Sequence, residues 1–296
     1  MWLGFHMPIS GGLDLAVARG LRVGCEAIQI FSRNPRAWQS RPLTDAAAER
    51  FRRARAEAGL RIVAVHLPYL PNLAADQGDL REKSMASLAE EMLRADRLGA
   101  EFVVAHPGHA PANEPRKKAC QRVGKNTARA LKALGRPGRA RLLLENMSGQ
   151  HGELGGAMEE LAWMIEALEA ASRGRFTADI CLDTAHAWGA GYDLARPKGQ
   201  EALLAEIDRW LGLERLALVH LNDSKVELGS RRDRHAAPGQ GRIGSRGLAR
   251  FIRHPGLMHL AGLMEPPGMT EENDLRQMIL MKRWRRAPRS AAARCS

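Results

Sequence analysis

The chain has 296 residues, of which 45% are hydrophobic and 26% charged, as in a soluble globular protein. Its 45 lysines and arginines exceed its 33 aspartates and glutamates, and the net charge of +12 favours polyanionic partners, nucleic acid first. No run of about 18 apolar residues occurs, so no membrane span is expected. Four widely spaced cysteines and no secretory signal predict a location in the reducing cytoplasm.

Short apolar runs alternate with helical segments along the chain. The predicted strands are residues 2–6, 27–31, 62–66, 102–106, 142–145, 180–183, 216–221 and 260–265. Continuous apolar strands that alternate with helices favour parallel pairing with both sheet faces covered. Eight such units in about 265 residues predict an α/β protein with a single (β/α)₈ TIM barrel, whose active site lies at the C-terminal ends of the strands. An open doubly wound sheet is the alternative, but no GxGxxG or P-loop motif supports it.

The helices carry recognisable end signals. Thr44 is the predicted N-cap of a helix over 45–58, and Gly59 is predicted to end it. Ser84 is predicted to precede a second helix, which ends at Gly99. We expect one barrel domain over residues 1–281, followed by a flexible basic tail over residues 282–296.

Residues of a type that binds metals stand at or next to the end of six consecutive predicted strands. They are His66, His106, Glu145, Asp183, His220 and Glu265, separated by 37 to 45 residues, the length of one β/α unit. Since the C-terminal ends of barrel strands meet on one rim, we expect these side chains to converge. A single histidine of this kind is usually structural, but six residues in phase indicate a shared site.

The segment 220–244, HLNDSKVELGSRRDRHAAPGQGRIG, follows the seventh predicted strand and is rich in arginine. By itself it is compatible with a solvated loop, but it contains several potential metal ligands: His220, Asp223, Asp233 and His235. Asp233 and His235 are two residues apart, so on an extended backbone their side chains point the same way. His186, three residues after Asp183, is a further candidate.

The full predicted ligand set contains five imidazoles and four carboxylates. Its members are His66, His106, Glu145, Asp183, His186, His220, Asp233, His235 and Glu265. So many carboxylates gathered without cations would have raised pKa values and would cost stability, so a multinuclear metal centre is predicted. Mixed His, Asp and Glu ligands without thiolate favour zinc or manganese. Neighbouring divalent ions are the arrangement used for phosphoester hydrolysis.

Over residues 4–268 the sequence resembles the endonuclease IV family of apurinic/apyrimidinic endonucleases. The motifs that carry the resemblance are GFHMPISGGL (4–13), NPRAW (34–38), HLPYLPNLA (66–74), HPG (106–108), LLEN (143–146), CLDTAHAWGAGYD (181–193), HLNDSK (220–225), DRH (233–235), GQGRIG (239–244) and MEPPG (264–268). The chain departs from the family at ENMSGQHGELG (145–155), where an ENTAGQG-like segment is common, and at Pro266, where threonine is more usual. Neither change removes a predicted ligand.

The resemblance implies a zinc enzyme with three ions that cuts double-stranded DNA on the 5′ side of an abasic site. It also implies a division of the ligands: His66 and His106 for one ion, Glu145 as a bridge to a second ion held by Asp183, His220 and Glu265, and His186, Asp233 and His235 for the third. As the catalytic residue, Glu145 would orient the attacking hydroxide or take the proton from the water that forms it. No obligate protein partner is indicated, and a monomer is expected.

Recognition of the lesion requires residues away from the metals. An abasic nucleotide must leave the helix to reach the mouth of a barrel. Arg36, in the loop after the second strand, and Tyr69, three residues beyond His66, are the predicted DNA contacts, in the minor groove and as a wedge or stacking ring respectively. A solvated arginine and a ring packed on Pro68 and Pro71 are the alternatives.

Two other functions remain open on the sequence. Glu145, Asp183, His220 and Glu265 alone resemble the single-metal site of xylose-isomerase-like sugar isomerases and epimerases. A nucleic-acid-binding barrel without activity would explain the charge but not the ligand set. Metal content separates the three hypotheses, since they require about three ions, one ion and none.

Overall fold

The structure is a computed structural model that describes residues 1–268 and 270–286. Within these residues eight strands form a closed barrel in the order β1-β10-β7-β6-β5-β4-β3-β2, and every neighbouring pair is parallel. They are β1 (Trp2–His6), β2 (Ala27–Phe31), β3 (Ile62–His66), β4 (Phe102–Ala105), β5 (Arg141–Glu145), β6 (Asp179–Asp183), β7 (Leu216–His220) and β10 (Ala261–Met264). The predicted barrel is confirmed, and the predicted strands differ from these bounds by no more than one residue at either end.

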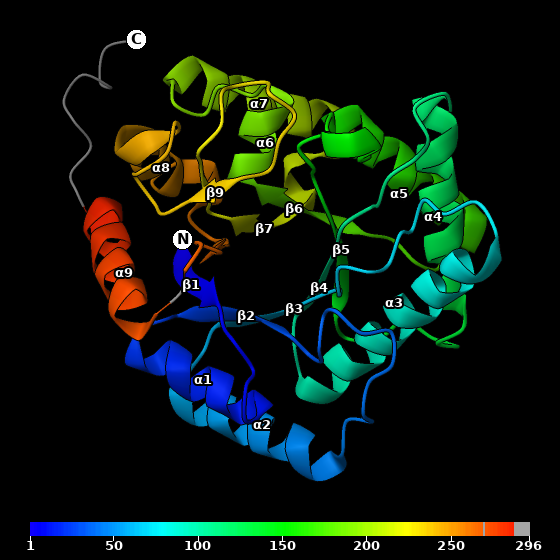
Figure 1. Ribbon diagram of the computed structural model, residues 1–296, viewed down its shortest axis with the longest axis horizontal. Coiled ribbons are helices and arrows are strands. Elements are labelled where there is room, and N and C mark those ends of the chain that lie inside the picture. The colour runs from blue at the N-terminus through cyan, green and yellow to red at the C-terminus, as the bar shows by residue number, and fades with distance from the viewer. Residues whose placement is uncertain (269, 287–296) are drawn as a thin grey trace.

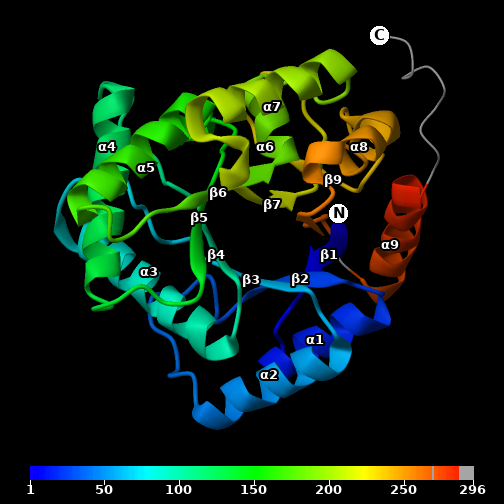
Figure 2. The ribbon, with the colours of Figure 1, turned by 180° about the vertical axis from the view of Figure 1, so that it is seen from behind.

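Helices surround the barrel on all sides, as the two opposite views show (Figures 1 and 2). They are α1 (Leu13–Arg22), α2 (Asp45–Ala58), α3 (Gly78–Leu98), α4 (Arg116–Lys132), α5 (Met158–Ser172), α6 (Thr184–Ala190), α7 (Pro197–Leu211), α8 (Gly244–Ile252) and α9 (Glu271–Arg286). Single 3-10 turns lie at η1 (Gln150–Gly152), η2 (Leu213–Arg215) and η3 (Pro255–Leu257). A short antiparallel pair, β8 (Asp223–Ser224) and β9 (His235–Ala236), follows β7. No described helix is long and apolar enough to cross a membrane.

Three of the four predicted helix-end signals are confirmed. The hydroxyl of Thr44 accepts a hydrogen bond from the backbone N–H of Ala47 at the start of α2, and Gly59 ends that helix in the left-handed conformation. Gly99 ends α3 in the same way. The prediction that Ser84 caps α3 is wrong, because the helix begins six residues earlier. The Ser84 hydroxyl is instead buried and donates to the carbonyl of Leu80, four residues back.

Two separate layers of apolar side chains determine which strand-end residues point into the barrel. Inside the barrel, side chains such as Ala64, Val104 and Leu143 form a small interior layer, whereas their strand neighbours Val65 and Leu144 belong to the large core between strands and helices. Side chains alternate between the two faces of a strand. Residues two positions beyond the interior layer therefore point inward again, at the C-terminal mouth of the barrel.

The C-terminal helix α9 packs beside α1 and α8 and reaches β1. The predicted flexible tail was expected to begin at residue 282, but residues 282–286 belong to α9. The ammonium of Lys282 donates to the carbonyl of Gly24 at 2.5 Å, and the guanidinium of Arg285 is paired with Glu26. These partners hold the cations of the last helical turn against the barrel. The rest of the predicted tail lies outside the described residues.

Candidate metal centre

The strand-end residues all point into the mouth of the barrel. His66, His106 and Glu145 follow the interior residues Ala64, Val104 and Leu143 by two positions, and the same spacing separates Asp183, His220 and Glu265 from the interior residues Cys181, Leu218 and Leu263. Glu145, Asp183 and His220 are fully buried at the floor. Above them lies a cavity of about 350 Å³, lined by His6, Phe31, His66, Tyr69, His106, His186, Asp233, His235, Glu265 and Pro266. The structure thus brings all nine predicted ligands to one site.

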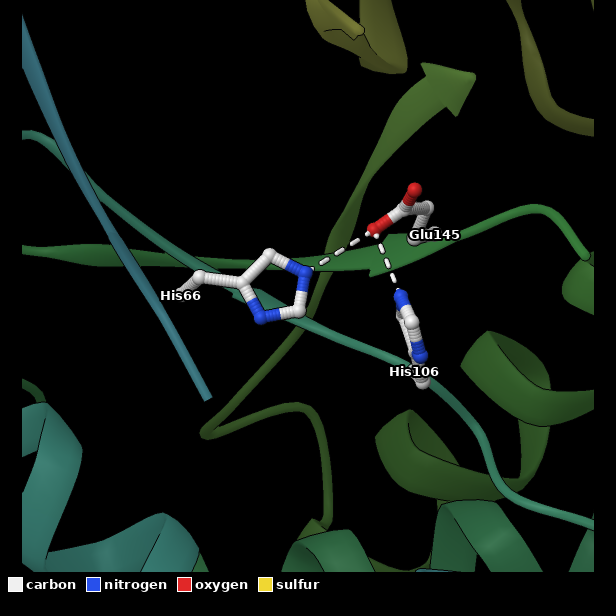
Figure 3. Close-up of side chains that lie close together, drawn as sticks. All are labelled: His66, His106 and Glu145. Carbon is white, nitrogen blue, oxygen red and sulfur yellow. Dashed lines mark hydrogen bonds and ion pairs between the residues drawn. The ribbon is translucent and has the colours of Figure 1, made fainter. Parts of the chain in front are cut away.

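One carboxylate oxygen of Glu145 lies close to nitrogens of two imidazoles. Nε2 of His66 and Nε2 of His106 lie 3.3 and 3.2 Å from Oε2 of Glu145, and Figure 3 shows both rings directed at this atom. The other oxygen, Oε1, lies 3.0 Å from Nδ1 of His220 and 3.3 Å from Nδ1 of His186. Glu145 is therefore at the centre of the cluster, within reach of ions on two sides.

The outer nitrogens of three imidazoles are held by backbone carbonyls. Nδ1 of His66 donates to the carbonyl of Leu67 at 2.7 Å, Nδ1 of His186 to that of Asn146 at 2.9 Å, and Nδ1 of His235 to that of Glu265 at 3.2 Å. A carbonyl can only accept, so in each neutral ring Nε2 carries a lone pair. These lone pairs face carboxylate oxygens. Two acceptors in contact need a cation between them, and a carbonyl on the far nitrogen is the usual support of a metal-binding histidine.

The third predicted ligand group, His186, Asp233 and His235, also contains buried polar atoms without a hydrogen-bond partner. Nε2 of His186 lies 3.3 Å from Oδ2 of Asp233, and Nε2 of His235 lies 3.1 Å from Oδ1 of Asp233. Both imidazole nitrogens and Oδ1 are buried, yet none of them is oriented for a hydrogen bond. Asp183 supports this group by capping α6, because its carboxylate accepts from the backbone N–H of His186 at 2.8 Å. The donor set and the orphaned atoms fit a divalent ion.

The group of Asp183, His220 and Glu265 is held together by two amides that the sequence analysis did not single out. Gln29 donates to Glu265 at 2.7 Å, and its Oε1 accepts from Nε2 of His220 at 2.9 Å. Asn222 donates to both Asp183 and Glu265, at 2.7 and 3.2 Å. The available signal was a lone amide within the apolar strand Ala27–Phe31. His6, the last residue of β1, was also missed, and its Nδ1 lies 3.3 Å from Oε1 of Glu265.

The charges of the cluster shift the pKa values of its members strongly. Burial alone would raise the pKa of Glu145, but the charges of His220 and His106 hold this pKa well below its usual range. Burial opposes the charged form of His186, yet Asp183 and Asp233 raise its pKa well above the usual value. The pKa of His235 is raised to about 9 for the same reason. The carboxylates thus require positive charge beside them, which protons or metal ions can supply.

Asp223, one of the potential ligands in segment 220–244, has a different role. Its buried carboxylate accepts hydrogen bonds from the backbone N–H groups of Ser224, Gly239, Gly241, Ile243 and Gly244. A side chain at position 241 would collide with this carboxylate, since an added Cβ would lie 2.4 Å from Oδ1, so glycine is required there. Asp223 therefore fixes the loop after β9, and β9 carries His235.

The two predicted DNA contacts lie beside the mouth. Tyr69 lines the cavity, is 60% exposed, and has its ring edge-on to Phe31 at 5.1 Å between centroids. Arg36 is exposed on the neighbouring loop. The two loops are joined, because the backbone N–H of Tyr69 donates to the carbonyl of Pro35 at 3.2 Å.

Comparisons with known proteins identify the family of the chain. The chain matches the family model of a xylose isomerase-like TIM barrel over residues 17–284. It is 40% identical over 284 residues to endonuclease 4 of Thermus thermophilus, covering 95% of this chain and 97% of the relative. With probable endonuclease 4 of Methanoculleus marisnigri it shares 40% identity over 265 residues, 90% of this chain and 92% of the relative.

Solved structures also include a similar endonuclease IV. Endonuclease IV from a second strain of Thermus thermophilus superposes with a TM-score of 0.85 at 38% identity, covering 96% of this chain and 98% of that one. A D-tagatose 3-epimerase-like protein, 17% identical with a TM-score of 0.69 over 96% and 97% of the two chains, shares the fold. From the motifs, the identity over most of its length and the fold, the chain belongs to the endonuclease IV family.

Proposed function

We propose that this protein is a DNA-repair endonuclease that hydrolyses the phosphodiester bond 5′ to an abasic site, leaving a 3′-hydroxyl and a 5′-deoxyribose phosphate. The observation that carries the proposal is the set of imidazole lone pairs and carboxylate oxygens that face one another in a single cavity. One ion could not satisfy groups on both sides of Glu145. The resemblance to endonuclease 4 over most of the chain supports the same conclusion.

The proposed centre holds three divalent ions, zinc in the first place, with manganese as the alternative. The first would bind His66, His106 and Glu145. The second would bind Glu145, Asp183, His220 and Glu265, and the third His186, Asp233 and His235. Among the described residues, four sets of candidate ligand atoms lie close together. His66, His106 and Glu145 form the first group, Asp183, His220 and Glu265 belong to the second, and Asp183, His186 and His235 join the second to the third. The fourth includes the thiol of Cys181 beside Glu145 and His220.

Divalent ions bound here would withdraw charge from the scissile phosphate and lower the pKa of water beside it. The residues of the chain supply the rest. Without ions, the charges of His220 and His106 hold the pKa of Glu145 well below its usual range. Bound divalent ions would supply this positive charge in their place, so its carboxylate can orient the attacking oxygen through a hydrogen bond. We assign it the catalytic role. The apolar interior layer below Glu145 closes the barrel from beneath, so substrate enters from the mouth alone.

Recognition of the abasic site is assigned to the loops beside the mouth. We propose that Arg36 enters the minor groove and that Tyr69 stacks at the lesion. The exposed ring of Tyr69 at the cavity edge and the link between its loop and that of Arg36 support this assignment. A nucleotide without a base costs least to extrude from the helix, and this difference would give selectivity.

A sugar epimerase is the competing function, because such proteins share the barrel. A single-metal epimerase site would need only Glu145, Asp183, His220 and Glu265. It would leave the buried and unpartnered Nε2 atoms of His186 and His235 without a role. The endonuclease explains both sets of groups, and we favour it for this reason.

The decisive experiment uses a DNA duplex with one stable tetrahydrofuran abasic analogue. The purified protein should cut the strand on the 5′ side of the analogue, leave an intact control duplex uncut, and contain about three ions per chain, each with roughly four ligands. A chelator should abolish the cleavage. A protein that carries one ion, epimerises a ketose and leaves the duplex intact would refute the proposal.

A further inference from the structure

The loop that carries Arg36 has no regular secondary structure, yet it is attached to a buried polar cluster. Residues 32–44 contain neither helix nor strand. Five polar side chains that the metal centre does not use join the start of this loop to α3, and we call them the loop anchor: Ser32, Arg33, Ser87, Glu91 and Arg94. Each is at most 7% exposed, and Glu91 is fully buried.

Arg33 joins the start of the loop to α3. Its Nε donates to the carboxylate of Glu91, and one terminal nitrogen donates to the hydroxyl of Ser87 at 2.6 Å. The other terminal nitrogen donates to the backbone carbonyl of Trp38 at 2.9 Å. One guanidinium therefore connects α3 with a point five residues further along the loop.

Arg94 makes a second connection further along the same helix. Its Nε and one terminal nitrogen donate to the hydroxyl and the carbonyl of Ser32, both at 2.6 Å. The other terminal nitrogen donates to the carbonyl of Arg41 at 3.2 Å. The hydroxyl of Ser32 donates onward to Glu91 at 2.6 Å. The anchor thus holds the loop at Ser32, Trp38 and Arg41, on both sides of Arg36.

Stability alone is a weak reason for such a cluster. Buried ion pairs lose hydration, and apolar residues of similar volume often give an equally stable fold. What two guanidinium groups offer is a fixed, planar set of donors that can hold several backbone carbonyls at once. The effect extends to the second recognition residue, because the carbonyl of Pro35 accepts from the backbone of Tyr69.

We infer that the loop anchor is a positioning device for lesion recognition: Glu91 orients Arg33 and Ser32, which fix the loop so that Arg36 and Tyr69 are presented to the DNA in one arrangement. This inference rests on the proposed function. It assigns to Glu91, which is fully buried and bonded to Ser32 and Arg33, an effect on DNA affinity that passes through Arg36.

The test is a double-mutant cycle on the full chain with Glu91→Gln, which keeps the shape and removes the charge, and Arg36→Ala. We expect Glu91→Gln to weaken binding to the abasic duplex by about tenfold, the scale of coupling within one hydrogen-bonded network. The cleavage rate at saturating DNA and the metal content should stay at the parent values. In the Arg36→Ala background, Glu91→Gln should weaken binding by less than about threefold.

The matched control is Glu26→Gln. Glu26 directly precedes β2 at the opposite end of the barrel, and its carboxylate is paired with Arg285. This variant should leave the affinity for abasic duplex unchanged. Limited trypsin digestion gives a readout without DNA, since cleavage after the exposed Arg36 should be faster in Glu91→Gln than in the parent or in Glu26→Gln.

Three results would overturn the positioning role: parent-like affinity in Glu91→Gln, an equal loss of affinity in Glu26→Gln, or a full additional loss in the Arg36→Ala background. Unchanged trypsin cleavage after Arg36 would do the same. A parent protein that does not cut abasic duplex would instead refute the proposed function, so the two failures are distinct.

Discussion

The two ends of the barrel use carboxylates in opposite ways. At the N-terminal ends of the strands, Glu26 is paired with Arg285 and Asp179 with Arg141. Glu26 also accepts a hydrogen bond from the backbone N–H of Leu3. At the C-terminal ends, Glu145, Asp183 and Glu265 face the imidazole of His220. Nearby, the buried Nε2 atoms of His186 and His235 have no hydrogen-bond partner.

The difference separates stability from chemistry. A guanidinium is always charged and cannot be displaced from its partner without leaving a bare carboxylate, so the N-terminal end is complete in the protein alone. A neutral imidazole offers a lone pair rather than a charge, so the C-terminal end is completed only by protons or cations. Barrel enzymes divide their two faces in this manner. Four measurements can break or sharpen the comparison.

Removal of metal should have the largest effect. With a strong chelator we expect cleavage of abasic duplex to fall to background, and the melting temperature to drop by at least about 5 °C, because binding energy is also folding energy. Zinc or manganese added back should restore both. If the chelator-treated protein keeps the melting temperature of the parent, the C-terminal end of the barrel needs no cations for its stability, and the contrast with the N-terminal end is wrong.

The next effect should come from Glu145→Gln. The amide keeps the shape but loses the charge that the four imidazoles surround, and it cannot orient the attacking oxygen as an anion. We expect the cleavage rate to fall by at least about 10²-fold, the scale of one acid–base contribution. Binding of abasic duplex, measured by fluorescence anisotropy, should be largely retained. A near-normal rate would refute the catalytic role.

Smaller effects should follow from Arg36→Ala and Tyr69→Ala, which lie at the C-terminal end but outside the carboxylate set. We expect each to weaken binding to abasic duplex by roughly tenfold, the scale of one stacked or inserted side chain. Elemental analysis should show unchanged metal content. Both variants should be compared on abasic and intact duplexes at one salt concentration. If both variants bind abasic duplex as tightly as the parent, the two loops have a structural role and no role in recognition.

The smallest effect on activity is expected from Glu26→Gln at the N-terminal end. The half-buried pair with Arg285 should contribute about 1–2 kcal/mol to the free energy of unfolding, with no change in cleavage rate. Despite partial burial, which raises it, the pKa of Glu26 is lowered by hydrogen bonds from Arg285 and Leu3. Its contribution is therefore present above the unfolded pKa and lost as the pH falls through the folded one. Urea unfolding at pH 7 and below about pH 4 measures this difference.

The sequence was most informative where one periodicity governs the structure. Strand ends could be placed within a residue because apolar runs and alternation determine them, and the convergence of His66, Glu145 and Asp183 followed from that register. The grouping of Asp233 with His186 came from the resemblance alone, since no periodicity spans the loop between them.

Other features depend on contacts that no local pattern encodes. Gln29 and Asn222 hold three ligands, but each is a single amide whose partners are distant in sequence. Ser84 resembles a helix cap, yet its hydroxyl turns back to Leu80 because the helix starts earlier. The end of α9 reads as a basic tail in composition, and only its carbonyl and carboxylate partners on the barrel show that it is ordered.

The carboxylate of Asp223 has a consequence for the order of events as the protein matures. Five backbone N–H groups donate to this carboxylate, which belongs to the chain itself and is present as soon as the chain folds. The loop after β9 therefore loses its conformational entropy during folding and not when an ion binds. His235, on β9, is then already in place when the first ion arrives. We therefore expect ion binding by this part of the proposed centre to need no rearrangement of the loop, so that its rate is set by the encounter with the cation.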